Sequence, residues 1–243
     1  MIFNFFCDAS IDINTKVACG GTYITCQDDM GQIREIGHRL IIQKNATNNS
    51  AEILAIWAGV VEAIKLREVY PNAVFRLFSD SKISLYGLRD WIKNWIRQIT
   101  PEGVLISSSG QPVANQQRFI DIFNMIVENS MKIEFYHQRG HVVDGKVSRD
   151  KARVQFIRAN KVPPEGLGVS IEYLSKCNDK IDNLSRNAIH VWQRQHKLAP
   201  CTEIEGITPF VYQIRDTMLA QYIRCIDKTS ITSHHDFKGG WSQ

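Results

Sequence analysis

The hydrophobic pattern of this chain changes period early, and this change restricts the fold more than any other feature. Residues 1–9, 16–26 and 32–43 are rich in β-branched and aromatic side chains and are separated by turn-forming sequences, which predicts three antiparallel strands in a meander. In residues 50–69 the apolar side chains instead recur at helical spacing over a wide stripe, which predicts a largely buried helix. A meander followed by a buried helix indicates an α/β protein.

The rest of the chain continues this alternation. Strands are predicted at residues 73–79 and 131–137, and helices near residues 81–98, 116–129 and 179–196. The order βββαβαβα corresponds to a five-stranded mixed β-sheet flanked by helices. Gly20 and Gly21 inside the second strand indicate a bulge or a close approach of another backbone. A further helix is predicted at 209–226, either packed on the domain or bound to a partner.

Composition sets the class of protein. The chain has 243 residues with 44% hydrophobic and 22% charged residues, which is typical of a folded globular protein. Its net charge of +4 is too small for a uniformly basic surface, so any nucleic-acid surface would be local. The six cysteines show no metal-finger spacing, and the start of the chain has no basic leader. We therefore expect a cytoplasmic monomer that does not enter membranes.

Four acidic residues stand at turning points of this pattern: Asp8, Glu52, Asp80 and Asp182. Asp8 ends a run of apolar strand residues where the chain turns and has no helix start to cap, so a functional or paired carboxylate is the better interpretation. If the fold gathers all four at one edge of the sheet, they can hold paired divalent cations against a phosphodiester. The pattern favours a metal-dependent nuclease.

Each acid other than Asp8 also has a structural interpretation when taken alone. Glu52 lies three residues after Asn49, as in a capping box, and Asp80 stands where an N-cap is expected. Asp182 precedes Arg186 by four residues, the spacing of an ion pair on a helix. Only their joint arrangement favours the functional interpretation.

Short motifs in a fixed order strengthen that interpretation. They are Asp8-Ala9-Ser10, Thr47-Asn48-Asn49-Ser50-Ala51-Glu52, Asp80-Ser81, Trp91 with Trp95, Pro112-Val113-Ala114-Asn115, Gly140-His141, and Asn178 to Asp182 with Leu184 and Ser185. In this set and order they resemble the motifs of the type 1 ribonuclease H family, from about residue 1 to about residue 196. The resemblance implies a ribonuclease H-like fold and an endonuclease that hydrolyses the RNA strand of RNA–DNA hybrids, giving 5′-phosphate and 3′-hydroxyl ends.

The resemblance also implies roles for these residues. Asp8 would bridge two Mg²⁺ ions about 4 Å apart, which Mn²⁺ could replace, and Glu52, Asp80 and Asp182 would complete their coordination. His141 would move protons near the leaving group or help the product to depart, although it could be a simple loop residue. These five residues form the predicted catalytic set.

Substrate contacts are implied in the same way. The amides of Asn48, Asn49 and Asn115 would lie along the RNA strand, where the 2′-hydroxyl separates RNA from DNA. Thr47 would contact a DNA phosphate, and Trp91 would line a channel for the DNA backbone. Without the resemblance, turn, cap and core roles would be the better interpretation of these residues.

The chain departs from the family beyond His141. Many members carry a basic protrusion between the positions of Trp95 and Asn115, and this chain has almost no charge there. It has instead a long insertion at about 142–177, at whose front basic side chains outnumber acidic ones. We predict that Lys146, Arg149 and Lys151 replace the protrusion as a grip on the hybrid, an ordinary solvated segment being the alternative. The predicted domains are 1–197, catalytic, and 198–243, a partly helical C-terminal extension.

Two other functions stay open at this point. A related nuclease could use the same carboxylates on another nucleic acid structure such as a DNA junction. A catalytically weak module could bind hybrids without cleaving them, although the presence of all four acids argues against it. Comparing cleavage of hybrid, duplex RNA and junction substrates would separate these possibilities.

Overall fold

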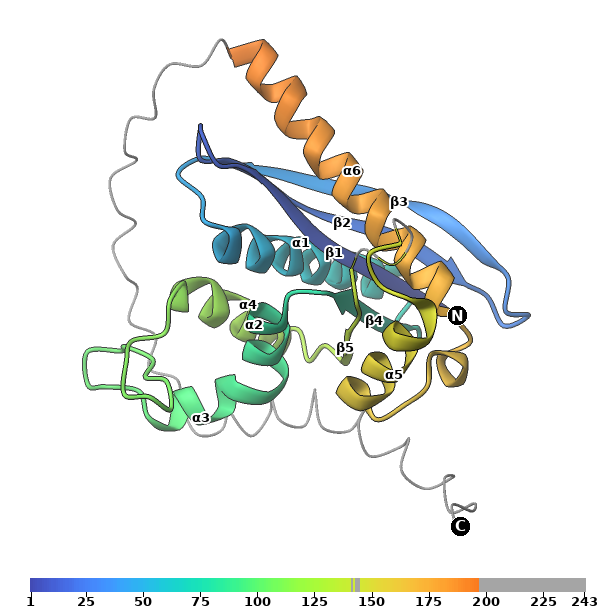
Figure 1. Cartoon of the computed structure of the whole chain (residues 1–243). Helices are drawn as coiled ribbons and strands as arrows, with labels where there is room; N and C mark the ends of the chain where they lie inside the picture. The colour runs from blue at the N-terminus through green and yellow to red at the C-terminus, as the bar shows by residue number, and fades with distance from the viewer. Residues whose placement is uncertain (141, 143–144, 197–243) are drawn as a thin grey trace.

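Five strands form one mixed sheet in the order β3-β2-β1-β4-β5 (Figure 1). The structure is a computed structural model that describes residues 1–140, 142 and 145–196. The first three strands pair antiparallel as a meander, whereas β4 and β5 run parallel to β1. The predicted five-stranded mixed sheet is therefore confirmed. The strands are β1 (Ile2–Asp12), β2 (Val17–Gln27), β3 (Ile33–Gln43), β4 (Val74–Ser79) and β5 (Ile133–His137).

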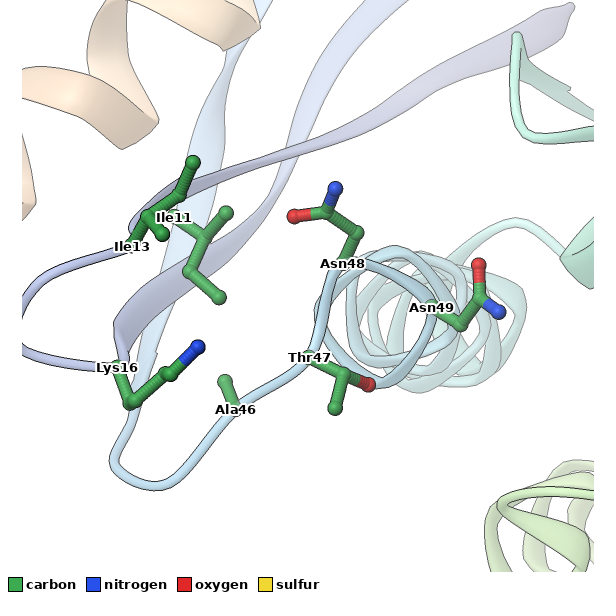
Figure 2. Close-up of a pocket in the computed structure, with 7 residues that line it drawn as sticks. All are labelled: Ile11, Ile13, Lys16, Ala46, Thr47, Asn48 and Asn49. Atoms are coloured by element: carbon green, nitrogen blue, oxygen red, sulfur yellow. The ribbon is translucent and has the colours of Figure 1, made fainter.

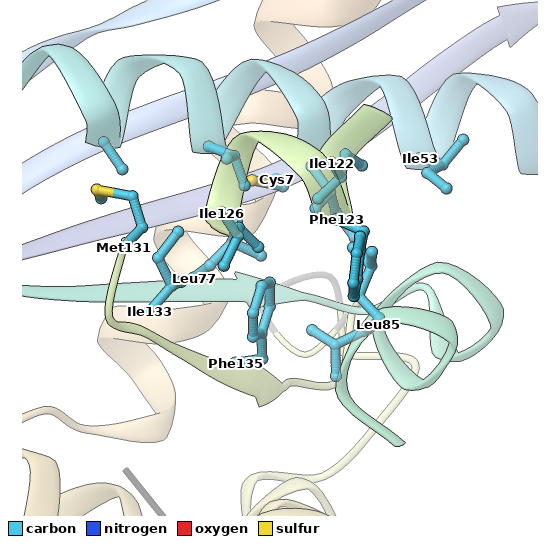
Figure 3. Packing of buried hydrophobic residues seen from close by; sticks show 14 of the residues in the cluster. Cys7, Ile53, Leu77, Leu85, Ile122, Phe123, Ile126, Met131, Ile133 and Phe135 are labelled. Atoms are coloured by element: carbon cyan, nitrogen blue, oxygen red, sulfur yellow. The ribbon is translucent and has the colours of Figure 1, made fainter. Parts of the chain in front are cut away.

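Helices cover both faces of this sheet, because neighbouring side chains along a strand point to opposite faces. Phe5 packs in a core with α1, α4 and α2, and its neighbour Phe6 packs in a second core with α5 and α6. Figure 3 shows α1 and α4 packed over Leu77 and Phe135 in the first core. The helices are α1 (Asn48–Val69), α2 (Lys82–Tyr86), the π-helix η1 (Gly87–Trp91), α3 (Ile92–Arg97), α4 (Gln116–Glu128), α5 (Arg149–Asn160), the 3-10 helix η2 (Pro164–Leu167) and α6 (Ile171–His196).

The last helix begins at Ile171, so the predicted start near residue 179 is wrong. The hydroxyl of Ser170 accepts a hydrogen bond from the Tyr173 amide at 3.1 Å, which is an N-cap contact. Leu174 and Cys177 then continue the apolar stripe of the helix into the second core. The predicted insertion at 142–177 thus holds α5, η2 and the first turns of α6.

Two glycines let helices approach the sheet closely from opposite sides. A Cβ at Gly20 would lie 2.8 Å from the Ala55 backbone nitrogen of α1, and one at Gly21 would lie 2.7 Å from Ile181 of α6. Of the two sequence interpretations, the close approach is correct, because the bulge of β2 lies elsewhere, between Ile24 and Thr25. Both helices carry predicted site residues beside these contacts.

Among the described residues, no helix has the length and apolar content needed to cross a membrane. Cys7, Cys19, Cys26 and Cys177 are buried free thiols, in keeping with their apolar sequence context. The predicted helix at 209–226 and the extension 198–243 lie outside the described residues.

Candidate active site

Asp8 lies where two neighbouring strands part. The parallel pairing of β1 with β4 ends at the pair formed by Cys7 and Ser79, whereas β1 itself continues to Asp12. Asp8 is therefore inside a strand, and the sequence interpretation that placed it at the strand end is wrong. Its side chain is 7% exposed and lies beside the space next to β1 where β4 no longer pairs with it.

Glu52 reaches the same space from the first turns of α1. The capping box of this helix is formed by Thr47 and Ser50, each of which accepts a hydrogen bond from the backbone of the other. The capping role considered for Glu52 is therefore wrong, because other residues already satisfy the helix start. In the part of the chain that the structure describes, one buried Glu52 carboxylate oxygen has no hydrogen-bond partner.

Asp80 follows the last residue of β4 and completes a cluster. Ser81, not Asp80, is the N-cap of α2, so the capping interpretation of Asp80 is also wrong. One carboxylate oxygen from each of Asp8, Glu52 and Asp80 lies within 4.8 Å of the others. We call these three residues the carboxylate trio. Oxygen atoms at this spacing suit a hard divalent cation.

Burial and repulsion both act on the trio. Desolvation raises the pKa of Asp8 well above its usual range, and the nearby charge of Asp80 raises it further. Burial likewise raises the pKa of Glu52, with the charge of Asp8 as the second cause. The trio therefore favours either protons or a cation in the space between its oxygens.

Asp182 projects from α6 beside the trio but is held differently. Its carboxylate accepts hydrogen bonds from the Ser10 hydroxyl at 2.8 Å and from Arg186 at 2.6 Å. The predicted pair between Asp182 and Arg186 is thus present. It coexists with a location close enough for its charge to raise the pKa of Asp8.

Two amide side chains that the sequence interpretation missed as site residues support Asp8. Asn178 donates a hydrogen bond to the Asp8 carboxylate at 2.9 Å, and its own oxygen accepts one from Gln138 at 2.5 Å. All three side chains are buried. The sequence signal for Asn178 was its place four residues before Asp182 in the last motif. Gln138 had no signal beyond its polarity at the end of an apolar strand.

The segment after β5 also supports Asp80. The His137 ring lies 3.2 Å from the Asp80 backbone oxygen, and Gly140 lies so close to the Asp80 carboxylate that no larger residue fits without displacement. The glycine of the Gly140-His141 motif is therefore explained by this close approach. His141 lies outside the described residues.

A hollow of about 490 Å³ opens between the β1–β2 turn and the start of α1 (Figure 2). Thr47, Asn48 and Asn49 line it together with Lys16, and all four are exposed. The Ala46 amide donates a hydrogen bond to the Lys16 carbonyl at 2.9 Å and ties the two segments together. Three predicted nucleic-acid contacts are thus grouped and accessible.

The remaining residues predicted to contact nucleic acid can be compared by the exposure of their side chains. Trp91, at the end of the π-helix, is 40% exposed, whereas Trp95 is 8% exposed and packs against Phe119. Trp91 is therefore accessible, as a channel residue must be, whereas Trp95 is part of the core; the channel role of Trp91 stays a prediction. Asn115 is exposed at the start of α4 in a left-handed conformation, with φ of 56°, and makes no capping contact through its side chain.

The predicted basic grip lies at and before the start of α5. Lys146, Arg149 and Lys151 are exposed there, and Arg149 stands 3.6 Å from Glu172 of α6. Ser148 caps this helix with its hydroxyl, so Arg149 and Lys151 lie in its first turn, whereas Lys146 precedes the helix. The three basic side chains thus lie on one short, exposed segment of the chain.

Comparisons with known proteins find matches over a large part of the chain. A family model described as RNase H matches residues 2–154, more than half of the chain. Ribonuclease H of Thermosynechococcus vestitus is 26% identical over 152 residues, covering 60% of this chain and 86% of that protein. The solution structure of the prototype foamy virus RNase H domain has a TM-score of 0.45 at 15% identity, covering 68% of this chain and 92% of that one. The crystal structure of LC9-RNase H1 also has a TM-score of 0.45 at 15% identity, covering 70% and 74%.

Proposed function

Since the chain belongs to the ribonuclease H family, it is a nuclease, and we propose that it hydrolyses the RNA strand of RNA–DNA hybrids, leaving 5′-phosphate and 3′-hydroxyl ends. The observation that carries the proposal is the convergence of Asp8, Glu52 and Asp80 from three separate elements. Asp8 is buried, Glu52 and Asp80 are partly buried, and the three carboxylates repel one another, so the charge of the site requires compensation. Such strain is typical of functional sites.

The trio fits divalent cations by its chemistry. Its donors are carboxylate oxygens, which Mg²⁺ and Mn²⁺ prefer, and one buried Glu52 oxygen has no hydrogen-bond partner among the described residues. We propose a pair of Mg²⁺ ions, replaceable by Mn²⁺, held by the trio and Asp182. When bound, such ions would acidify the attacking water and stabilise the leaving oxygen.

The surrounding side chains fix the carboxylates for this task. Asn178 donates to one Asp8 oxygen and the Ala9 amide donates to the other, at 2.9 and 2.8 Å, so these bonds orient Asp8 and favour its ionised form. Ser10 orients Asp182 from the neighbouring strand. We keep His141 as the proposed proton-transfer residue.

We assign recognition of the hybrid to the exposed amides and Trp91. Asn48, Asn49 and Asn115 can donate to and accept from a 2′-hydroxyl, and no capping contact occupies the Asn115 side chain. Thr47 would contact a phosphate at the helix start, and the exposed face of Trp91 would stack along the DNA backbone. We also infer a cytosolic monomer.

Cleavage assays test the proposed activity. The full chain should cut the RNA strand of a labelled hybrid in Mg²⁺ or Mn²⁺ and stop when EDTA is added. Duplex RNA and a four-way DNA junction serve as competing substrates of matched length. Cleavage of the junction but not of the hybrid would refute the proposal, as would equal cleavage by the parent and an Asp80→Asn variant.

The basic grip has its own test. Reversing Lys146, Arg149 and Lys151 to Glu should weaken hybrid binding and reduce the slope of affinity against salt by about one for each lost phosphate contact. A matched control reverses three exposed cations on other elements, Arg34, Lys65 and Lys132. If both variants bind the hybrid alike at every salt concentration, the grip proposal is wrong.

A further inference from the structure

The inserted helix α5 ends against the outer edge of β5, beside the candidate site. Asn160, its last residue, accepts a hydrogen bond from the His137 amide at 2.8 Å and donates one to the His137 carbonyl at 2.7 Å. One side chain thus satisfies both outward-facing backbone groups of the last residue in an edge strand, as a neighbouring strand would. These contacts fix the position of the His137 backbone.

Arg89 of the π-helix holds Asn160 in this orientation. Its guanidinium donates to the Asn160 side-chain oxygen at 3.1 Å and to the Ala159 carbonyl at 3.2 Å. Two donors, Arg89 and the His137 amide, therefore meet the same oxygen, and this arrangement determines which end of the Asn160 amide faces which partner. The end of α5 is anchored to both the π-helix and β5.

The His137 ring carries this constraint to the site. It is buried, lies 5.6 Å from the Tyr86 ring, and places its Nε2 atom 3.2 Å from the Asp80 carbonyl oxygen. A carbonyl oxygen only accepts, so Nε2 carries the hydrogen and donates it. The backbone of Asp80 is thereby tied to β5, and its carboxylate belongs to the trio.

We propose that Asn160 is a positioning residue for the active site. It fixes the His137 backbone and so keeps the imidazole against the Asp80 carbonyl, which holds the Asp80 carboxylate in place beside Asp8 and Glu52. The proposal rests on the proposed function of the trio. It makes the end of the insertion part of the active-site scaffold, in addition to any contact that its basic start makes with the substrate.

Asn160→Ala in the full chain tests the proposal, with Val154→Ala as the control because Val154 is exposed on the same helix. Binding of Mn²⁺ alone, measured by calorimetry, should weaken about 10-fold in Asn160→Ala, as is typical when a supporting partner of a metal ligand is lost. The kcat should fall at fixed metal concentration while the KM for the hybrid stays unchanged. Val154→Ala should match the parent in all three.

A second pair of variants separates positioning from general stability. His137→Gln retains an amide donor that can reach the Asp80 carbonyl, whereas His137→Leu removes the donor. His137→Gln should recover much of the Mn²⁺ affinity that His137→Leu loses. This comparison tests the link from His137 to Asp80, so it can overturn the proposal even if Asn160→Ala does not fold.

The proposal is overturned if Asn160→Ala lowers only the melting temperature and leaves Mn²⁺ affinity and kcat at parental values. Equal Mn²⁺ affinity in His137→Gln and His137→Leu would also overturn it. Metal binding is measured without substrate, so it judges the positioning role separately from hybrid cleavage. A parent that binds Mn²⁺ but does not cut hybrids would count against the proposed function alone.

Discussion

The trio and Asp182 are close enough for the charge of Asp182 to raise the pKa of Asp8, yet their own charges are compensated in different ways. The trio places three carboxylates within 4.8 Å of one another, with Asp8 and Glu52 shifted toward the protonated form by burial. Asp182 instead pairs with Arg186 on its own helix and receives the Ser10 hydroxyl. The charge of the trio requires an external cation or protons, whereas the charge of Asp182 is compensated by Arg186 within the chain.

This difference predicts that the trio and Asp182 are not equally important for activity. The carboxylates of the trio repel one another and would share a cation, whereas Asp182 is paired with Arg186 on its own helix. Substitutions in the two regions should therefore differ in the size of their effect on activity and in the sign of their effect on stability.

The largest expected effect is on cleavage. Asp80→Asn should lower kcat at least about 100-fold, beyond the range usual for residues that only support a metal ligand, and Asp182→Asn should lower it only about 10-fold. Single-turnover cleavage of a hybrid at saturating Mg²⁺ measures both. Similar losses in the two variants would remove the distinction between the regions.

A smaller effect is expected on stability without metal. The raised pKa of Glu52 in the folded protein means that its contribution to stability is present below its usual pKa and is lost as the pH rises through the folded value. Glu52→Gln should therefore increase the free energy of unfolding at pH 7 by on the order of 1 kcal/mol in EDTA, with no gain near pH 4.

Asp182→Asn is the control for that experiment, because it breaks an ion pair and should not stabilise the protein at pH 7. Urea unfolding at both pH values provides the measurement. A Glu52→Gln variant that is less stable than the parent in EDTA at pH 7 would contradict the description of the trio as repulsive.

The smallest effect concerns Arg186. Its side chain is largely exposed, so its pair with Asp182 is worth at most about 1 kcal/mol. Arg186→Ala should free the Asp182 carboxylate and lower the Mg²⁺ concentration for half-maximal activity by up to about fivefold. Lys176→Ala breaks a pair with Glu172 on the same helix and should leave this concentration unchanged. A higher Mg²⁺ requirement in Arg186→Ala would show that Arg186 supports the site instead of competing with the metal.

Local pattern was enough to predict much of the fold. The strands and α1 could be predicted from periodicity, because the spacing of apolar residues along the chain shows which face of each element is buried. The start of α6 was predicted too late, since the cap at Ser170 was not recognised within the insertion. The alternative capping roles of Glu52 and Asp80 failed for a related reason: Thr47 is the N-cap of α1, and Ser81, the residue after Asp80, is the N-cap of α2.

The site was predictable only in part. The four acids stood out as a set because of their motifs, and three of them converge. Their catalytic roles, the function of His141 and the cytoplasmic location stay predictions. Gln138, His137 and Asn160 could not be found from sequence, because their importance comes from partners that are 23 to 57 residues away along the chain.

The sequence by itself determined which segments form strands and helices and which carboxylates were available, because hydrophobic period and residue type are local properties. Only the tertiary structure decided how those carboxylates differ. The parting of β1 and β4 at Asp8, the close approach of both helices at Gly20 and Gly21, and the anchoring of α5 on His137 are contacts between distant segments. Burial and charge pairing depend on such contacts, so they set the pKa values and the partners of each acid only after the chain has folded.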